Sequence, residues 1–154
     1  MDSIDRKIIE ELQRNSALSN QELSERVNLS ASPCLRRVKN LEKSGVIQGY
    51  TAIVDAEIYG LPINVFISIR LSEQTDNRIK AFEMAVMELD EVLDCFLMSG
   101  HQDYLLRVVS KNFKSYERFI RERLSKVPGI SSLESNFVFG QVKRKTDYPN
   151  PEFL

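Results

Sequence analysis

The hydrophobic pattern after residue 62 alternates between a two-residue period and a three- to four-residue period, and this alternation restricts the fold more than any other feature. Two-residue periods are typical of strands, and three- to four-residue spacings are typical of helices. The segments in order are strand 63–71, helix 77–89, strands 92–98 and 104–109, helix 113–127 and strand 131–141. This β-α-β-β-α-β order predicts a ferredoxin-like domain.

Two helices on one face of a four-stranded sheet leave the other face uncovered. We expect aromatic side chains to make that face apolar, namely Phe66, Phe96, Phe137 and Phe139. An exposed apolar face usually contacts a partner. Soluble oligomers are mostly symmetric, so a second copy of the chain is the simplest partner.

The first fifty residues show three helical patterns separated by short breaks. Ser3 is a candidate cap for the first helix, and Ser19 or Asn20 begins the second. Ser30 or Ser32 opens the third, which runs to about Ser44 and ends at Gly45. A short helix, a tight turn and a longer helix indicate a helix-turn-helix. The predicted class is therefore α+β, an N-terminal (winged) helix-turn-helix followed by the ferredoxin-like domain.

The third helix has one basic face. Cys34, Val38 and Leu41 fall within about 80° of one another and form its buried stripe. Between Ser30 and Gly45 four basic residues stand against Glu42 alone. The candidate DNA-binding residues are Ser30, Ser32, Pro33, Arg36, Arg37, Lys39, Asn40 and Lys43. The alternative is a three-helix bundle whose basic face only meets solvent.

Residues 46–54 are rich in β-branched and aromatic side chains and contain Gly49, which predicts a strand. It is either a wing beside the DNA or the strand that connects two domains, and we favour the connector. Gly60 and Pro62 indicate a linker. The expected divisions are a DNA-binding domain at 1–50, a connecting strand and linker at 51–62, and an effector-binding and oligomerisation domain at 63–154.

Composition narrows the function classes. The net charge of −1 excludes a polycation, so any DNA contact depends on a local patch repeated by oligomerisation. No apolar run is long enough to span a membrane, and the acidic N-terminus does not resemble a signal peptide, so we expect a cytoplasmic protein. Cys34, Cys95 and a single histidine are too few and too far apart for a zinc site. We expect no cofactor. A disulfide is possible but goes against a cytoplasmic compartment, so we expect both cysteines to be small core or near-surface residues.

Several motifs, in their order and spacing, resemble the Lrp/AsnC family of transcription regulators along nearly the whole chain. They are IDRKII at 4–9, LSASPCLRRV at 29–38, LEKSGVIQGY at 41–50, SGHQDYLL at 99–106 and VPGI at 127–130. The resemblance implies dimers formed through the C-terminal domain, four of which assemble as an octamer with duplex DNA wrapped outside. It also implies an amino-acid effector, leucine, methionine or another apolar one, bound between dimers.

The resemblance places the effector site on the loop after the second strand of the sheet. The implied residues are Leu97, Ser99, Gly100, His101, Gln102, Asp103 and Tyr104, with Asn136, Phe137 and Val138 from another subunit. Asp103 can accept hydrogen bonds from an ammonium, and backbone N–H groups near Gly100 can bind a carboxylate. The residues alone favour a plain tight turn at Gly100 and Asp103. The family often has an acidic residue where this chain has His101, which leaves the ligand's identity open. His101 either contacts the ligand or is a loop residue exposed to solvent.

Two other functions share this architecture. One is a tetrapyrrole-decarboxylase-like enzyme, but the sequence offers no paired carboxylates, metal cluster or nucleophile arrangement, so we expect no enzyme. The other is an amino-acid sensor that no longer binds DNA, which the basic face argues against. The sequence therefore predicts a DNA-binding regulator controlled by a small effector.

Overall fold

The computed structural model describes residues 1–149 and 151; residues 150 and 152–154, at the end of the predicted C-terminal domain, lie outside the described part. The chain forms two compact units, which are Met1–Ile53 with Val142–Leu154, and Val54–Gln141. The C-terminal segment thus groups with the first unit, whereas the predicted boundaries placed it in the second. The backbone N–H of Tyr148 donates to Oε1 of Gln13, 2.8 Å away.

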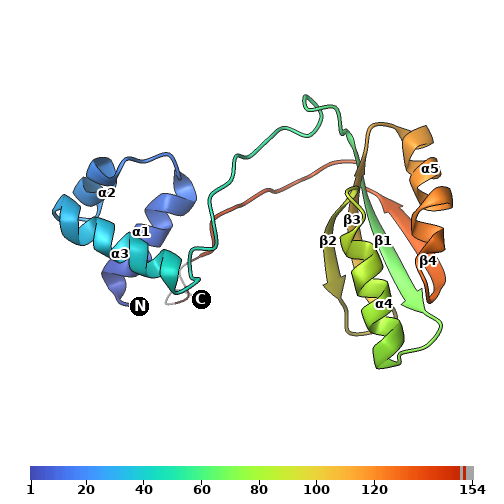
Figure 1. Cartoon of the computed structure of the whole chain (residues 1–154). Helices are drawn as coiled ribbons and strands as arrows, with labels where there is room; N and C mark the ends of the chain where they lie inside the picture. The colour runs from blue at the N-terminus through green and yellow to red at the C-terminus, as the bar shows by residue number, and fades with distance from the viewer. Residues whose placement is uncertain (150, 152–154) are drawn as a thin grey trace. The chain divides into compact units, whose positions relative to one another are not determined.

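The first unit contains three helices, α1 (Ser3–Arg14), α2 (Asn20–Arg26) and α3 (Ala31–Lys43) (Figure 1). Their shared core consists of Ile8, Leu23, Val27, Cys34 and Leu41. The helix-turn-helix is thus confirmed.

The helix caps differ in part from the prediction. Asp2, rather than Ser3, caps α1, and Ser19 caps α2. Ser30 occupies the cap position of α3 without a side-chain hydrogen bond. The turn between α2 and α3 has Asn28 at φ 56°, a conformation that asparagine tolerates better than most residues.

The strand predicted at 46–54 is not formed. Within the described residues this segment has no strand pairing, and Tyr50, Ile53 and Val54 are exposed. A strand requires a neighbouring strand for its backbone hydrogen bonds, and no described segment pairs with this one.

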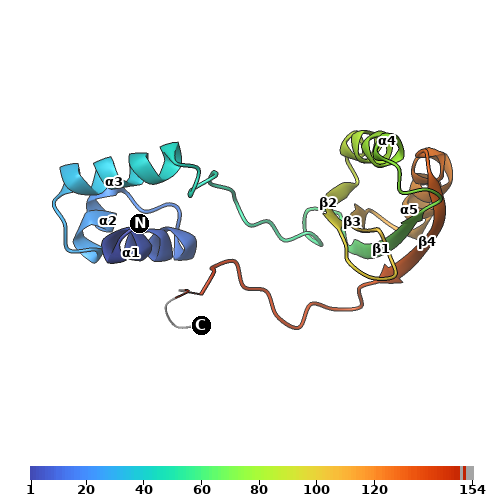
Figure 2. The same ribbon diagram turned by 90° about the horizontal axis from the view of Figure 1, so that it is seen from below.

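The second unit has the predicted β-α-β-β-α-β order. Its strands are β1 (Ile63–Leu71), β2 (Val92–Leu97), β3 (Tyr104–Ser110) and β4 (Ile130–Phe137), arranged as the antiparallel sheet β2-β3-β1-β4. The helices are α4 (Asp76–Met87) and α5 (Phe113–Glu122), which the short 3₁₀ turn Leu124–Lys126 follows. Both helices lie on the same side of the sheet (Figure 2).

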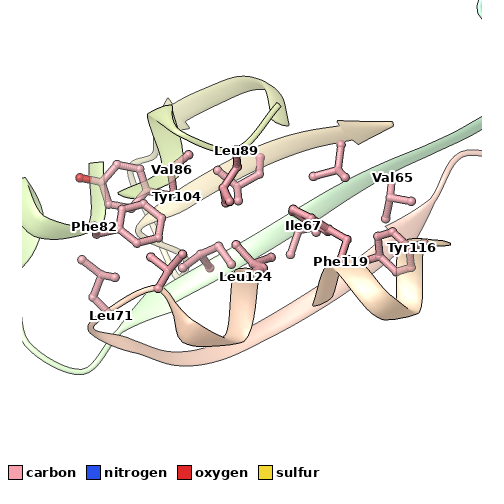
Figure 3. Packing of buried hydrophobic residues seen from close by; sticks show 14 residues of the cluster. Val65, Ile67, Leu71, Phe82, Val86, Leu89, Tyr104, Tyr116, Phe119 and Leu124 are labelled. Atoms are coloured by element: carbon pink, nitrogen blue, oxygen red, sulfur yellow. The ribbon is translucent and has the colours of Figure 1, made fainter. Parts of the chain in front are cut away.

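The core of this unit lies between the sheet and the two helices. Alternate residues of β1 point into it, namely Val65, Ile67, Ile69 and Leu71. Phe82 of α4 stacks on Tyr104 of β3, while Phe119 and Tyr116 of α5 cover the other end (Figure 3). Within the described residues no helix has the length and apolarity to cross a membrane.

The other face of the sheet is less aromatic than predicted. The pairing places Phe96 beside Leu105 on it, and Phe66 beside Arg107, whose guanidinium reaches Asn64 and Asp94. Phe137 pairs opposite Val65 and therefore lies on the helix-covered face, where its ring packs against Phe113 and Tyr116. Phe139 follows the end of β4 and is fully exposed. The prediction for Phe137 was wrong, and Phe139 is outside the sheet.

Candidate DNA-binding face and ligand-binding loop

Most of the predicted DNA-binding residues lie on one exposed face of the recognition helix α3. Ser30 and Ser32 are exposed at its N-terminus, and Pro33 is half-buried in its first turn. Arg36, Lys39, Asn40 and Lys43 are exposed along its length. Within the described residues none of the three cations in that set forms an ion pair. Three positive charges are therefore available to an anionic partner.

Arg37 is placed differently from these cations. Its Nη1 lies 2.8 Å from Oδ2 of Asp2 and 2.7 Å from Oδ1 of Asp5, and its side chain is only 29 % exposed. Hydrogen bonds to these carboxylates raise the pKa of Arg37, and the backbone N–H of Asp5 together with Arg37 lowers the pKa of Asp2. The pattern that predicted a basic face does not reveal these carboxylates.

Two further contacts hold the ends of α3, and neither residue was predicted from the sequence to have this role. Nδ2 of Asn20, on α2, donates to the carbonyl of Ala31 at 2.9 Å and so joins the two helices across their turn. The hydroxyl of Tyr50 donates to Oε1 of Glu42 at 2.9 Å. Partial burial and this hydrogen bond raise the pKa of Tyr50 to about 12.

The predicted ligand loop connects β2 to β3. The N–H of Met98 donates to the carbonyl of Asp103 at 2.9 Å and closes the loop, while Gly100 has φ +118°. Ser99, Gly100 and His101 are exposed, and Gln102 is half-buried. In the described part of the chain no hydrogen bond engages the backbone N–H groups of residues 99–102. Such free N–H groups in a turn can bind an anion.

Asp103 also has a structural role within the chain. Its Oδ2 accepts from the N–H of Leu71 and its Oδ1 from Nε2 of Gln74, both at 2.7 Å. Its own N–H donates to the carbonyl of Ile69. Each carboxylate oxygen has two lone pairs, so the group can accept a further hydrogen bond from an ammonium.

The remaining predicted ligand residues are separated in the structure. Tyr104 is buried, and its hydroxyl donates to Oε1 of Glu83 at 2.8 Å, so it faces the core rather than the loop. Leu97, at the end of β2, is 72 % exposed. Phe137 pairs opposite Val65, and Val138 donates to Asn64. The loop instead meets β1 at Ile69 and Leu71, so one copy of the chain does not bring residues 136–138 to it.

Neither cysteine belongs to a site. Cys34 is buried in the first unit and Cys95 is exposed in the second, and both are free. Burial raises the pKa of the Cys34 thiol, and the pKa of the Cys95 thiol is raised by partial desolvation of the sulfur and by the nearby Glu83 carboxylate. Among the described residues no group of histidine, cysteine and carboxylate side chains is arranged to hold a metal.

The chain is similar to known proteins along nearly its full length. Residues 1–48 match the winged helix-turn-helix DNA-binding family, and residues 64–148 match the Lrp/AsnC ligand-binding domain. It is 39 % identical to the leucine-responsive regulatory protein of Escherichia coli over 144 residues, which cover 94 % of this chain and 88 % of that protein.

Two solved structures agree with these matches. A transcriptional regulator of Neisseria meningitidis in complex with L-methionine is 36 % identical, with a TM-score of 0.93 and coverage of 100 % of this chain and 99 % of that one. An AsnC family regulator of Agrobacterium tumefaciens is also 36 % identical, with a TM-score of 0.92 and full coverage of both chains. These relatives are regulators rather than enzymes, which confirms the prediction that the chain is not an enzyme. The chain belongs to the Lrp/AsnC family of DNA-binding transcription regulators with a ligand-binding domain.

Proposed function

We propose that the chain binds specific sequences of duplex DNA through α3. We also propose that an apolar amino acid bound at the loop 98–103 changes its DNA affinity or its assembly. The observation that carries the proposal is the face of α3, where Arg36, Lys39 and Lys43 are exposed with no ion pair inside the described chain. Because the relatives named above come from bacteria, in which DNA lies in the cytoplasm, we propose that this protein also works there.

The face of α3 contains side chains of both kinds that DNA recognition uses. Arg36 and Asn40 can make bidentate contacts with guanine and adenine edges. Ser30, Ser32 and Pro33 stand at the N-terminal end of the helix, which contacts bases when such a helix enters the major groove. Lys39 and Lys43 bind phosphates.

One copy has too little positive charge to bind DNA tightly, so the function requires assembly. The face of the sheet that carries Phe66, Leu105 and Phe96 supports pairing with a second copy. A dimer presents two recognition helices to half-sites about one DNA turn apart. We propose that such dimers assemble further to an octamer.

The effector is an amino acid such as leucine or methionine. The free N–H groups of residues 99–102 would bind its carboxylate, and Asp103 would accept from its ammonium. Tyr104 can contribute only backbone atoms, because its side chain is in the core. Leu97, with Phe137 and Val138 of another copy, would form the apolar wall, and Asn136 of that copy would lie beside it. The methionine bound to the similar Neisseria regulator supports this class of ligand.

The test is calorimetric titration of the protein with each of the twenty amino acids, combined with light scattering and DNA footprinting. We expect saturable binding of one or a few apolar amino acids, a shift in mass, and a protected sequence whose affinity changes with that ligand. If no genomic fragment is protected at low salt, the DNA function is rejected and the alternative is an amino-acid sensor that does not bind DNA. If none of the twenty amino acids gives heat of binding, the proposal of an amino-acid effector is rejected.

A further inference from the structure

We propose that Arg37 is a positioning residue, which binds the N-terminal end of α1 and thereby orients the recognition helix without contacting DNA itself. The proposal rests on the proposed DNA-binding function and assigns a separate role to one residue of the basic helix.

The contact joins two helices that are far apart in sequence. Asp2 and Asp5 form a reciprocal cap at the start of α1: the N–H of Asp5 donates to Oδ1 of Asp2 at 2.9 Å, and the N–H of Asp2 to Oδ2 of Asp5 at 3.1 Å. The other oxygen of each carboxylate accepts from Nη1 of Arg37. Every oxygen of the two carboxylates therefore has a partner, and the cap and the ion pair form one unit.

The position of Arg37 on α3 separates it from the DNA-facing side chains. At about 100° per residue, Arg36, Lys39, Asn40 and Lys43 lie within one sector of roughly 100°, and Arg37 lies a further 60° beyond it. Arg37 follows Cys34 by three residues and precedes Leu41 by four, so it flanks the buried stripe. Its guanidinium points toward α1 rather than toward the exposed face.

The position of Arg37 at the N-terminal end of α1 also depends on the two aspartates. The N-terminal end of a helix carries a partial positive charge, which disfavours a cation there. The carboxylates of Asp2 and Asp5 offset this and hold Arg37 against the helix end. Met1 and Asp5 line a shallow hollow with Arg36, Arg37 and Asn40, which places this contact beside the DNA-facing residues.

The small core of the first unit makes such a directional contact useful. Its buried apolar residues are few, and α3 contributes only Cys34 and Leu41 to the buried set. Apolar packing is non-directional and permits a helix to turn about its axis more readily than an ion pair with fixed hydrogen bonds does. The Arg37 contact therefore fixes the rotation of α3 about its axis more closely than its apolar stripe does alone.

The test compares Arg37→Gln, Asp5→Asn and the double variant in the full-length protein, with a duplex selected from a random pool by the unaltered protein. Asn at position 5 keeps an oxygen that can accept from the N–H of Asp2 but removes the charge. We expect each single variant to bind the duplex roughly ten-fold more weakly, and the double variant to bind no more weakly than either single one. The slope of log affinity against log salt should stay that of the unaltered protein, because no phosphate contact is lost.

Two controls separate positioning from charge and from folding. Glu10→Gln removes a carboxylate of α1 that pairs with Arg14, so it changes the net charge as Asp5→Asn does without touching Arg37, and it should leave affinity unchanged. Thermal unfolding shows that each variant is folded; should Asp5→Asn fail to fold, Asp2→Asn takes its place.

A direct DNA contact by Arg37 gives the opposite results. Asp5→Asn would then release Arg37 and leave binding equal or tighter, while Arg37→Gln would lower the salt slope by about one. Either result overturns the positioning role. Failure of the unaltered protein to select any duplex would instead reject the DNA function itself.

Discussion

The carboxylate of Asp103 accepts a hydrogen bond from the backbone N–H of Leu71 over 2.7 Å, which joins the ligand loop to the end of β1. Leu71 is buried, and the sheet register shifts between Arg70 and Leu71. The loop that is proposed to bind the effector is therefore fixed to the chain that leads into α4.

Replacement of Asp103 by alanine should affect both stability and ligand binding. It leaves the N–H of Leu71 without its acceptor, which costs about 1–3 kcal/mol in the free energy of unfolding. The ammonium of the effector also loses its proposed partner, so amino-acid affinity falls while the intrinsic DNA affinity stays largely intact. Urea unfolding and calorimetry measure the two effects.

Gln74→Ala is the control, because it removes one hydrogen bond to Asp103 but no proposed ligand contact. Unchanged ligand affinity in Asp103→Ala would remove Asp103 from the site.

Arg36→Ala should weaken specific DNA binding by about 1–3 kcal/mol and relax the preference at one base pair if Arg36 pairs with guanine. A phosphate contact would instead lower affinity evenly across sequences. Competition between matched and mismatched duplexes distinguishes the two. Arg118→Ala on α5 is a matched control, since this exposed arginine lies in the other unit. An equal loss in both variants would indicate a non-specific effect of charge.

Phe137→Ala should destabilise the second unit by about 2 kcal/mol, less than a fully buried phenylalanine because the ring is half-exposed. The ring lies 5.2 Å from that of Phe113 and 5.1 Å from that of Tyr116, between centroids. Phe139→Ala, two residues later and fully exposed, should change stability by less than about 0.5 kcal/mol. Urea unfolding of both variants checks this, and equal losses would contradict the assignment of Phe137 to the helix-covered face.

Tyr104 should ionise only at high pH. Burial, followed by the hydrogen bond to Glu83, raises its pKa well above the ordinary value of 10.0. Because the folded-state pKa is raised, the stabilisation is complete below pH 10 and is lost as the pH rises through the folded-state value. In a spectrophotometric titration, Tyr104→Phe should lose amplitude only from the high-pH part of the curve. Lost amplitude near pH 10 would mean that Tyr104 is accessible.

Asp2 should contribute to stability in the opposite pH range. The N–H of Asp5 and the guanidinium of Arg37 lower its pKa below the ordinary 3.8. A lowered folded-state pKa gives a stabilisation that is present above pH 3.8 and is lost as the pH falls through the folded-state value. Asp2→Asn should therefore reduce the loss of thermal stability on acidification. Parallel melting curves of variant and unaltered protein across this range would argue against the contact.

The order of elements was predictable because the period of the hydrophobic pattern depends only on local sequence. The side of the sheet on which Phe137 lies was not, since residues 137–139 are all apolar and give no alternation to read. Its side follows instead from pairing opposite Val65, a contact 72 residues away in the chain.

The candidate site was predictable in part for the same reason. The exposed face of α3 follows from its helical period, whereas the contact of Arg37 with Asp2 and Asp5 depends on how α1 and α3 pack. One missed feature did have a local signal. Asp2 and Asp5 stand three residues apart before an apolar run, which is the spacing of a reciprocal helix cap, and this favours Asp2 over Ser3 as the cap.

Because Val142–Leu154 groups with Met1–Ile53, the compact unit Val54–Gln141 is an insertion within the first unit, although the ligand-binding family match extends to residue 148. A fragment cut after residue 53 would lack part of its own unit, including the segment whose Tyr148 bonds to Gln13. A single proteolytic nick between residues 54 and 62 would leave both parts joined by that segment. A shortened protein that keeps the first unit whole would therefore require excision of residues 54–141, with a short flexible linker from Ile53 to Val142, rather than truncation.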